Sequence, residues 1–352
     1  MVTIIKWSIG IDMGAKTFRC CLCSIDNSQK VKVKASRKFN NTAGGLQELL
    51  TWIRKHYKDQ QAPLSIAMEA TGVYYEQCAL LLQKESFRVS VILPTKAKRY
   101  LQALGLKSKN DKIDAEGLAR MGAEQQLAEW SAASPVIYSL RLLTRQHEDM
   151  QKSITSFGNQ LHAVEHGMYR FGDIEKTYNE TIASLQQLLK QVENAISETI
   201  KHNEVLKQKV EMLCSIKGVG EHTAATIIAE TNGFALFENQ KQLESYAGYD
   251  VIENQSGDRI GRTKISKKGN SHIRRILHMA SLNVVAYNVK PFVDLYERVH
   301  PKTNLKMKGY VAVQRKLLVM LYTLYKKNEK FDPQYKPKTI REKELKPSFG
   351  LA

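Results

Sequence analysis

Two long runs of apolar residues, spaced alternately by three and four, fill the middle of the chain and constrain its fold most. The first run covers residues 140–168 and is interrupted only by His147, and the second covers 178–196. This spacing places the apolar side chains along one stripe of a helix. We therefore predict two long helices that pair as an antiparallel hairpin or zip onto another subunit. The segment 131–207 is interpreted as a helical coiled-coil spacer and dimerisation element.

The first third of the chain alternates short apolar segments with amphipathic ones. Three strand-like segments in succession, followed by alternating helices and strands, predict a mixed sheet flanked by helices. That is the order of an RNase H-like α/β fold, which we assign to residues 1–130. The predicted strands cover 4–11, 17–25, 31–39, 64–68 and 88–93, and the predicted helices cover 45–57 and 74–85.

Acidic residues stand at the ends of two predicted strands that are otherwise apolar, Asp12 and Glu69. Asp111 and Asp114 are three residues apart, which places both carboxylates on one face of a helix. If the two strands are neighbours, all four acids converge. Divalent cations then offset their repulsion, and Mg²⁺ prefers such hard oxygen ligands. The residues predict a metal site suited to phosphoryl transfer, and solvated surface acids are the competing interpretation.

The chain is strongly basic, with 53 Lys and Arg against 35 Asp and Glu, a net charge of +18. Such an excess favours a polyanionic partner, because Lys and Arg set against phosphates release counterions. A protein made basic for solubility is the alternative. Near the predicted metal site, the basic residues predicted to contact nucleic acid are Lys96, Lys98, Arg99 and Lys109.

No apolar run approaches the ~20 residues that a membrane helix needs, so we predict no membrane partner. The N-terminus runs into a predicted strand and lacks a signal-peptide pattern. The five cysteines are an odd number, and Cys20 and Cys23 lie in a predicted strand whose odd offset points them to opposite faces. These features predict free thiols and a cytoplasmic protein.

The last third, 208–330, is predicted to be a smaller, α-rich domain that binds nucleic acid. The stretch S-I-K-G-V-G-E-H at 215–222 resembles a helix-hairpin-helix turn, where N–H groups at the start of a helix hold a phosphate. Gly218 and Gly220 are therefore predicted contacts, and a plain turn is the alternative. Residues 259–275 hold seven basic residues and no acidic one, which suits phosphate binding. The predicted contacts there are Arg259, Lys264, Lys267, Lys268, Arg274 and Arg275. A basic, partly disordered tail is predicted over 331–352.

Three N-terminal motifs, I-G-I-D-M-G, M-E-A-T-G-V-Y and K-N-D-K-I-D-A, occur in order and resemble the DEDD signature of the insertion-sequence 110 family of transposases. That family's N-terminal domain resembles the RuvC Holliday-junction resolvase. The resemblance implies that Asp12, Glu69, Asp111 and Asp114 are catalytic metal ligands. The implied cofactor is Mg²⁺, with Mn²⁺ as the alternative.

The C-terminal third resembles the transposase domain of the same family. The resemblance rests on A-G at 247–248, S-G at 256–257 and G-R-T-K-I-S-K-K-G-N-S-H-I-R-R at 261–275. The matching serine in the family is catalytic, which makes Ser256 the predicted nucleophile; by itself it is one ordinary serine. The family often has leucine and proline where this chain has Tyr249 and Val251. The resemblance covers about 1–120 and 210–290.

The resemblance implies DNA cleavage through a covalent serine–DNA link, followed by strand exchange. In the family the metal site and the serine are thought to form one composite centre, with subunits contributing in trans. The implied partners are donor and target DNA, a structured guide RNA from the same element, and further copies of the chain in a dimer or tetramer. The implied location is the bacterial cytoplasm, at the nucleoid. The charge is consistent with RNA guidance and equally with plain DNA binding.

Two other functions compete with this prediction. In a hydrolytic junction endonuclease, water attacks the phosphate and Ser256 is structural. In a non-catalytic scaffold, the basic segments only hold nucleic acid. A further motif, H-A-V-E-H at 162–166, matches an inverted zinc-protease pattern. It lies on a predicted long helix without a third ligand downstream, and solvated histidines are the favoured interpretation.

Overall fold

The structure is a computed structural model in which the chain divides into two compact units, Met1–Ala132 and Ala133–Ala352. It describes residues 2–58, 61–105, 110–252, 255–256, 259–260, 264–303 and 305–334. Of residues 255–256, 259–260 and 302–303 it describes the backbone alone. Predictions that fall on Lys109 and on the tail from residue 335 onward lie outside the described residues, as do those on the side chains of Ser256 and Arg259.

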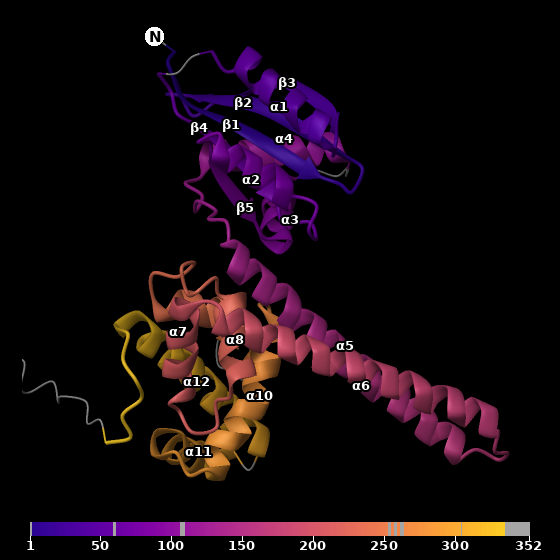
Figure 1. The fold of residues 1–352 in the computed structure, drawn as a ribbon. Helices are drawn as coiled ribbons and strands as arrows, with labels where there is room; N and C mark the ends of the chain where they lie inside the picture. Colours follow the sequence, from indigo (N-terminus) through magenta and orange to yellow (C-terminus); the bar gives the residue numbers. More distant parts are fainter. Residues whose placement is uncertain are drawn as a thin grey trace, which may run out of the picture. The chain divides into compact units, whose positions relative to one another are not determined.

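The first unit is built on a five-stranded mixed sheet in the order β3-β2-β1-β4-β5 (Figure 1). The first three strands form an antiparallel meander, and β4 and β5 continue the sheet parallel to β1. This is the RNase H-like arrangement predicted from the sequence. The strands are β1 (Ile4–Met13), β2 (Thr17–Asp26), β3 (Val31–Asn40), β4 (Leu64–Glu69) and β5 (Arg88–Ile92).

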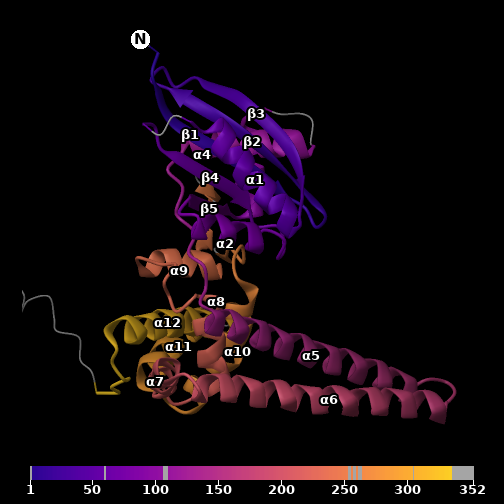
Figure 2. The same ribbon diagram turned by 45° about the horizontal axis from the view of Figure 1, so that its top comes forward.

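Helices cover both faces of this sheet (Figures 1 and 2). One face packs against α1 (Ala43–His56) and α2 (Glu76–Lys84) around Ile9, Ile11 and Leu22. The other face packs against α4 (Asp111–Glu124), and α3 (Pro94–Ala103) begins two residues after β5 ends. The prediction placed the start of α2 two residues too early, because Gly72 adopts φ +56° in a turn that precedes the helix.

The cysteines of β2 confirm the alternation expected of a strand. Cys20 packs with the core on the α1 side, whereas Cys21 and Cys23 pack against α4 on the other side. All five cysteines are free thiols. The C-x-x-C pattern therefore holds neither a disulfide nor a pair of thiols on one face.

The second unit begins with the two predicted long helices, α5 (Pro135–Glu165) and α6 (Gly172–Lys201). They lie side by side as an antiparallel hairpin (Figures 1 and 2). Leu140, Val192 and Ile196 of the predicted apolar stripes are buried, and Ile154 and Leu185 nearer the tip are half-buried. The stripes therefore face each other within one chain.

The rest of the second unit is a helical bundle with two short strand pairs between residues 247 and 271. Its core joins the base of the α5–α6 hairpin to the later helices around Phe234, Leu277 and Leu317. None of the described helices is long and apolar enough to cross a membrane. The helices are α7 (Glu204–Cys214), α8 (Glu221–Glu230), α9 (Gln240–Ala247), α10 (Ser271–Ala286), α11 (Lys290–Thr303) and α12 (Lys306–Lys327), and the strands are β6 (Val251–Ile252), β7 (Gln255–Ser256), β8 (Arg259–Ile260) and β9 (Lys264–Ile265).

Candidate functional site

Asp12 and Glu69 occupy equivalent positions in neighbouring strands. The parallel pairing of β1 with β4 runs up to Ile11 opposite Met68, and each acid is the next residue of its strand. Both are half-buried. Since equivalent residues of paired strands point to the same face of a sheet, the register brings these two carboxylates together at one edge.

Helix α4 crosses this face antiparallel to β1. A Cβ atom added to Gly122 would collide with the Ser8 hydroxyl, and one added to Gly10 would collide with backbone atoms of Ala115 and Ala119. The later part of α4 therefore lies over the start of β1, and its earlier part lies over Gly10. Two glycines at these points allow the helix to approach the sheet this closely.

The same geometry carries the start of α4 to the carboxylate end of the strands. Asp12 lies two residues beyond Gly10, about 6.6 Å along the strand, which corresponds to roughly four residues of helix. Leu118 of α4 contacts the sheet at Gly10, and the residue four positions before it in the helix is Asp114. Asp114 therefore lies near the level of Asp12. Asp111 precedes Asp114 by three residues and shares its face. Asp114 is half-buried and Asp111 is exposed, so Asp111 lies at the rim of the cluster.

The start of α4 also favours negative charge. Asn110 caps it, its side-chain oxygen accepting from the backbone N–H of Lys112 and of Ile113 at 3.0 Å each. Asp111 and Asp114 are in the first turn, where the helix dipole stabilises a carboxylate. The donor set of four carboxylates is the kind that Mg²⁺ prefers. The donor atoms of these side chains therefore fit a divalent cation in their chemistry.

Ser256 lies on a β-arm between α9 and α10. The β-arm consists of two short antiparallel strand pairs. In one, Val251 of β6 is opposite Ile265 of β9, and in the other, Ser256 of β7 is opposite Arg259 of β8. This short hairpin was not predicted from the sequence. It sets the backbone of Ser256 opposite that of a basic residue, Arg259.

A buried polar network fixes the root of this arm. Glu230 is almost fully buried and accepts two hydrogen bonds from the Arg145 guanidinium, at 2.7 and 2.9 Å. It also accepts one from the Asn270 amide at 2.6 Å, and Asn270 donates its backbone N–H to the Tyr246 carbonyl at 2.7 Å. Burial opposes ionisation of Glu230, but the bonds and charge of Arg145 outweigh it and lower its pKa. Sequence reasoning missed these residues, because nothing in the motifs marks Arg145 or Glu230.

Two family models match the two ends of the chain. Residues 9–170 match the DEDD transposase model of the IS110 group, and residues 210–297 match the model described as transposase of the IS116/IS110/IS902 family. The chain belongs to the IS110 family of transposases. The first model covers the unit of this IS110 transposase that carries the carboxylates and continues through α5 of the second unit, and the second model covers the region of Ser256.

Curated relatives extend over almost the whole IS110 transposase. It is 27% identical to a pilin gene-inverting protein of Moraxella bovis over 93% of this chain and 98% of that protein. It is 24% identical to a transposase for insertion sequence element IS1111A of Coxiella burnetii, over 53% of this chain and 57% of that protein. Among solved structures, Thermus thermophilus RuvC matches 33% of this chain and 93% of its own length, at 13% identity and a TM-score of 0.27.

The departure from the family pattern at Tyr249 is accommodated in the core. The Tyr249 ring is fully buried, and its hydroxyl donates to the Gln314 side chain at 3.0 Å. Gly248, directly before it, ends α9 with φ +74° and leaves room for the backbone of Gly269. A tyrosine in place of leucine therefore gains a polar partner and leaves the root of the arm intact.

The predicted nucleic-acid contacts divide into exposed and internally bonded residues. Gly220 begins α8 without a side-chain cap, whereas Gly218 adopts φ +102° against the backbone of α10. Arg274 donates from Nη1 to the carbonyls of Ala247, Gly269 and Asn270, which favours a structural role for it. Arg275 lies 3.4 Å from Glu148. The exposed members are Lys96, Lys98, Arg99, Lys264, Lys267 and Lys268.

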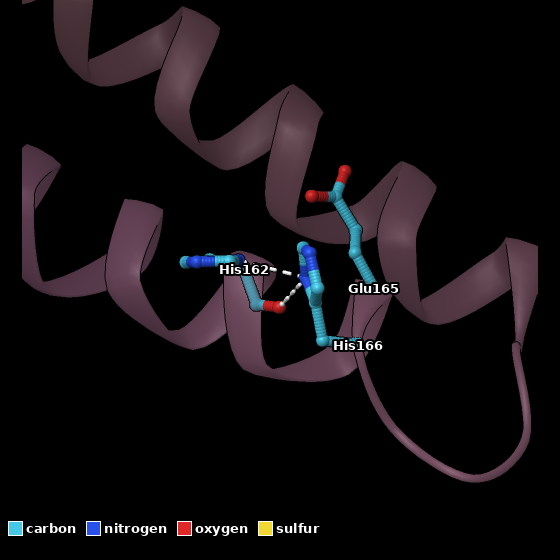
Figure 3. A group of neighbouring side chains, drawn as sticks. All are labelled: His162, Glu165 and His166. Atoms are coloured by element: carbon cyan, nitrogen blue, oxygen red, sulfur yellow. Dashed lines mark hydrogen bonds between the residues drawn. The ribbon is translucent and has the colours of Figure 1, made fainter.

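The H-A-V-E-H motif brings its three side chains together at the end of α5 (Figure 3). The described part of the chain holds one group of at least three possible metal ligands within 4.8 Å of one another, His162, Glu165 and His166. The four acids of the first unit are not that close together. His162 and His166 approach to 2.8 Å between their Nδ1 atoms, and His166 Nδ1 also lies 2.8 Å from the His162 carbonyl. That last contact makes His166 a donor that closes the final turn of α5.

Proposed function

We propose that this protein is the recombinase of an insertion sequence, which cuts and exchanges DNA strands at the ends of its element. The matches of both its ends to models of one transposase family carry the proposal. The names of its relatives support it, since inverting a gene and moving an insertion sequence both require DNA strands to be cut and rejoined.

We assign Mg²⁺, or Mn²⁺ in its place, to the four carboxylates of the first unit. Asp12 and Glu69 hold it from the strand ends, and Asp111 and Asp114 hold it from the start of α4. When bound, the metal would neutralise charge on a phosphate and favour attack at its phosphorus. The positions of Asp12 and Glu69 side by side at the ends of paired strands support this assignment, because carboxylate oxygens are the ligands that Mg²⁺ prefers.

We assign the nucleophile to Ser256. Its hydroxyl oxygen forms a bond to phosphorus and its proton passes to a carboxylate of the cluster. The bond from phosphorus to the displaced DNA oxygen breaks, and that oxygen takes up the proton from the carboxylate. A hydroxyl of the second DNA strand then attacks the same phosphorus, displaces the serine oxygen and restores the hydroxyl of Ser256. One phosphodiester is exchanged for another, so the cycle needs no energy-rich cofactor.

The proposal includes partners that follow from the family resemblance. They are donor and target DNA, a structured guide RNA encoded by the element, and further copies of this chain in a dimer or tetramer. The net charge of +18 supports a polyanionic partner. A DNA substrate places the activity at the nucleoid, in the bacterial cytoplasm.

Strand exchange by carboxylate variants tests the metal assignment. The protein is expressed with the noncoding flanks of its element and incubated with labelled junction DNA, with and without Mg²⁺. Asp12→Asn and Asp114→Asn keep the side-chain shape but remove the charge, and each is expected to lower the rate about 100-fold or more. Asp149→Asn, on the exposed face of α5, is the matched control and should retain the rate. Exchange by Asp12→Asn at the wild-type rate, or exchange in a chelator, would refute the assignment.

A further inference from the structure

A row of three residues crosses the sheet at the carboxylate end, Asp12, Arg19 and Lys38. In the strand register, Asp12 of β1 is opposite Arg19 of β2, and Arg19 is opposite Lys38 of β3. Residues directly opposite in a sheet have Cβ atoms about 4.5–5.5 Å apart and share a face. Two cations therefore follow a proposed metal ligand in consecutive positions across the sheet.

The row lies on the face that α4 covers. Cys21, two residues beyond Arg19 on β2, packs against Ala115 and Ala119 of α4. Side chains two apart in a strand point the same way, so Arg19 and its partner Lys38 point to the α4 side. They lie beyond the first turn of the helix, on the same side of the sheet as the four carboxylates.

Lys112, in the first turn of α4, is a third cation on this side of the sheet. Burial, and then the Glu116 carboxylate, raise the pKa of the Cys21 thiol to about 12, and the Lys112 ammonium opposes the rise. Lys112 is thus close enough to Cys21 for its charge to act there, and it is exposed. Glu116, one helical turn on, is the acidic neighbour of this group.

Arg19 and Lys38 differ from cations elsewhere on the same strands. Neither forms an ion pair with a carboxylate of the described residues, whereas Arg37 on the opposite face of β3 is 2.7 Å from Glu48. Lysines on an edge strand such as β3 also prevent edge-to-edge association. That role applies to every lysine of β3, Lys38 included, but not to Arg19, which lies on the interior strand β2.

The basic residues of α3 lie on the other side of the carboxylates. This helix begins after the edge strand β5, and Leu101 near its end fills the space over Gly117 of α4. Lys96, Lys98 and Arg99 are all exposed. In the sheet, β1 and β4 lie between β2 and β5. The acids at their ends therefore have cations on both sides, those of β2 and β3 on one side and those of α3, after β5, on the other.

We propose that Arg19, Lys38 and Lys112 form a phosphate-binding flank that holds the backbone of a nucleic acid strand beside the carboxylates. The inference rests on the proposed function and adds to it the residues that position the strand on the β2–β3 side. The ligand chemistry is the phosphodiester, which DNA and the guide RNA share. Since these residues hold flanking phosphates and not the reacting one, they are positioning residues.

Salt-dependent binding by the full-length protein tests the flank. Affinity for labelled junction DNA and, separately, for the element RNA is measured from 50 to 200 mM salt for wild type, Arg19→Ala and Lys38→Ala. Each lost phosphate contact should reduce the slope of log affinity against log salt by about 0.9 for duplex and 0.7 for single strands. Lys32→Ala, on the opposite face of the same strand, is the matched control and should keep the wild-type slope.

Phosphate ethylation interference locates the lost contact. In wild type, we expect ethylation of a phosphate within a few nucleotides of the cut to block DNA binding. In Lys38→Ala, ethylation of the same phosphate should have no effect. The same result in the RNA arm alone would assign the flank to the guide. Unchanged slopes and interference in both arms, with strand exchange intact in wild type, would overturn the flank while leaving the proposed function standing. Binding without any strand exchange by wild type would instead refute the proposed function.

Discussion

His222, the second residue of α8, is held in its neutral form by its surroundings. Its ring lies against that of His147 at 4.1 Å between centroids, and its Nδ1 is buried without a hydrogen-bond partner among the described residues. Burial, and then the charge of His147, lower its pKa from 6.5 to about 4, although Glu193 and Glu148 act in the opposite sense. This explains why the apolar stripe of α5 tolerates His147, since the ring packs against a neutral partner.

The pKa of His222 makes folding dependent on pH. An unfolded histidine takes up its proton near pH 6.5, whereas the folded one does so only near 4. The stabilisation is therefore fully present above pH 6.5 and is lost as the pH falls toward 4. Wild type should lose about 3 kcal/mol of its free energy of unfolding from this group across that pH range, and His222→Gln should not show this loss. Urea unfolding at several pH values measures it, with the exposed His202→Gln as control. An equal pH dependence in wild type and His222→Gln would contradict this account.

Arg274 and Gly218 have structural contacts that their residue types do not reveal. Both lie in segments whose composition predicts phosphate binding, yet the Arg274 guanidinium holds three carbonyls at the root of the arm. The backbone of α10 leaves no room for a side chain at Gly218. Composition identifies a basic segment, but the tertiary fold decides which of its cations remain available.

At the scale of elements, the seating of α4 on the sheet decides whether the four acids meet. The helix approaches at Gly10 and Gly122, where any side chain would meet backbone or hydroxyl atoms. Two of the four acids lie on this helix, so a shift of α4 would separate them from Asp12 and Glu69. Stability and activity should therefore change together when this contact is altered.

Substitution of Gly10 tests that coupling. The added methyl of Gly10→Ala would collide with the Ala115 carbonyl and the Ala119 amide, which belong to the backbone and cannot rotate away. We expect a loss of about 1–3 kcal/mol in the free energy of unfolding and a larger fall in strand exchange. Gly44→Ala, where nothing lies within 4 Å, is the control and should be neutral or slightly stabilising. A Gly10→Ala protein with wild-type stability and exchange would show that the close approach of α4 is dispensable.

The strands and helices of the first unit were largely predictable from the sequence. The contacts between side chains, in both units, were not. Alternating apolar residues gave the order of strands and helices, because burial of one face imposes a period on each element. The row of Asp12, Arg19 and Lys38 depends on the register of three strands, which no local pattern specifies. The bonds from Glu230 to Arg145 and Asn270 join residues 85 and 40 positions apart and leave no sequence motif.

For the molecule as a whole, the sequence predicts a carboxylate site in the first third of the chain and a nucleophilic serine in the last third. The structure has these two regions in different compact units. The carboxylates lie on a rigid sheet edge, and Ser256 lies on an arm whose root is fixed by buried hydrogen bonds. The central claim is that both act on one phosphodiester. It predicts that loss of either centre abolishes the same covalent intermediate.

Trapping that intermediate is the most direct measurement. Protein expressed with the noncoding flanks of its element is incubated with labelled junction DNA and Mg²⁺, denatured, and separated on a gel. We predict a protein-linked DNA band in wild type and in Ser271→Ala, the exposed serine at the start of α10. The band should be absent in Ser256→Ala and in Asp12→Asn. Cut DNA without a covalent band, together with a fully active Ser256→Ala, would contradict the account and indicate a hydrolytic nuclease.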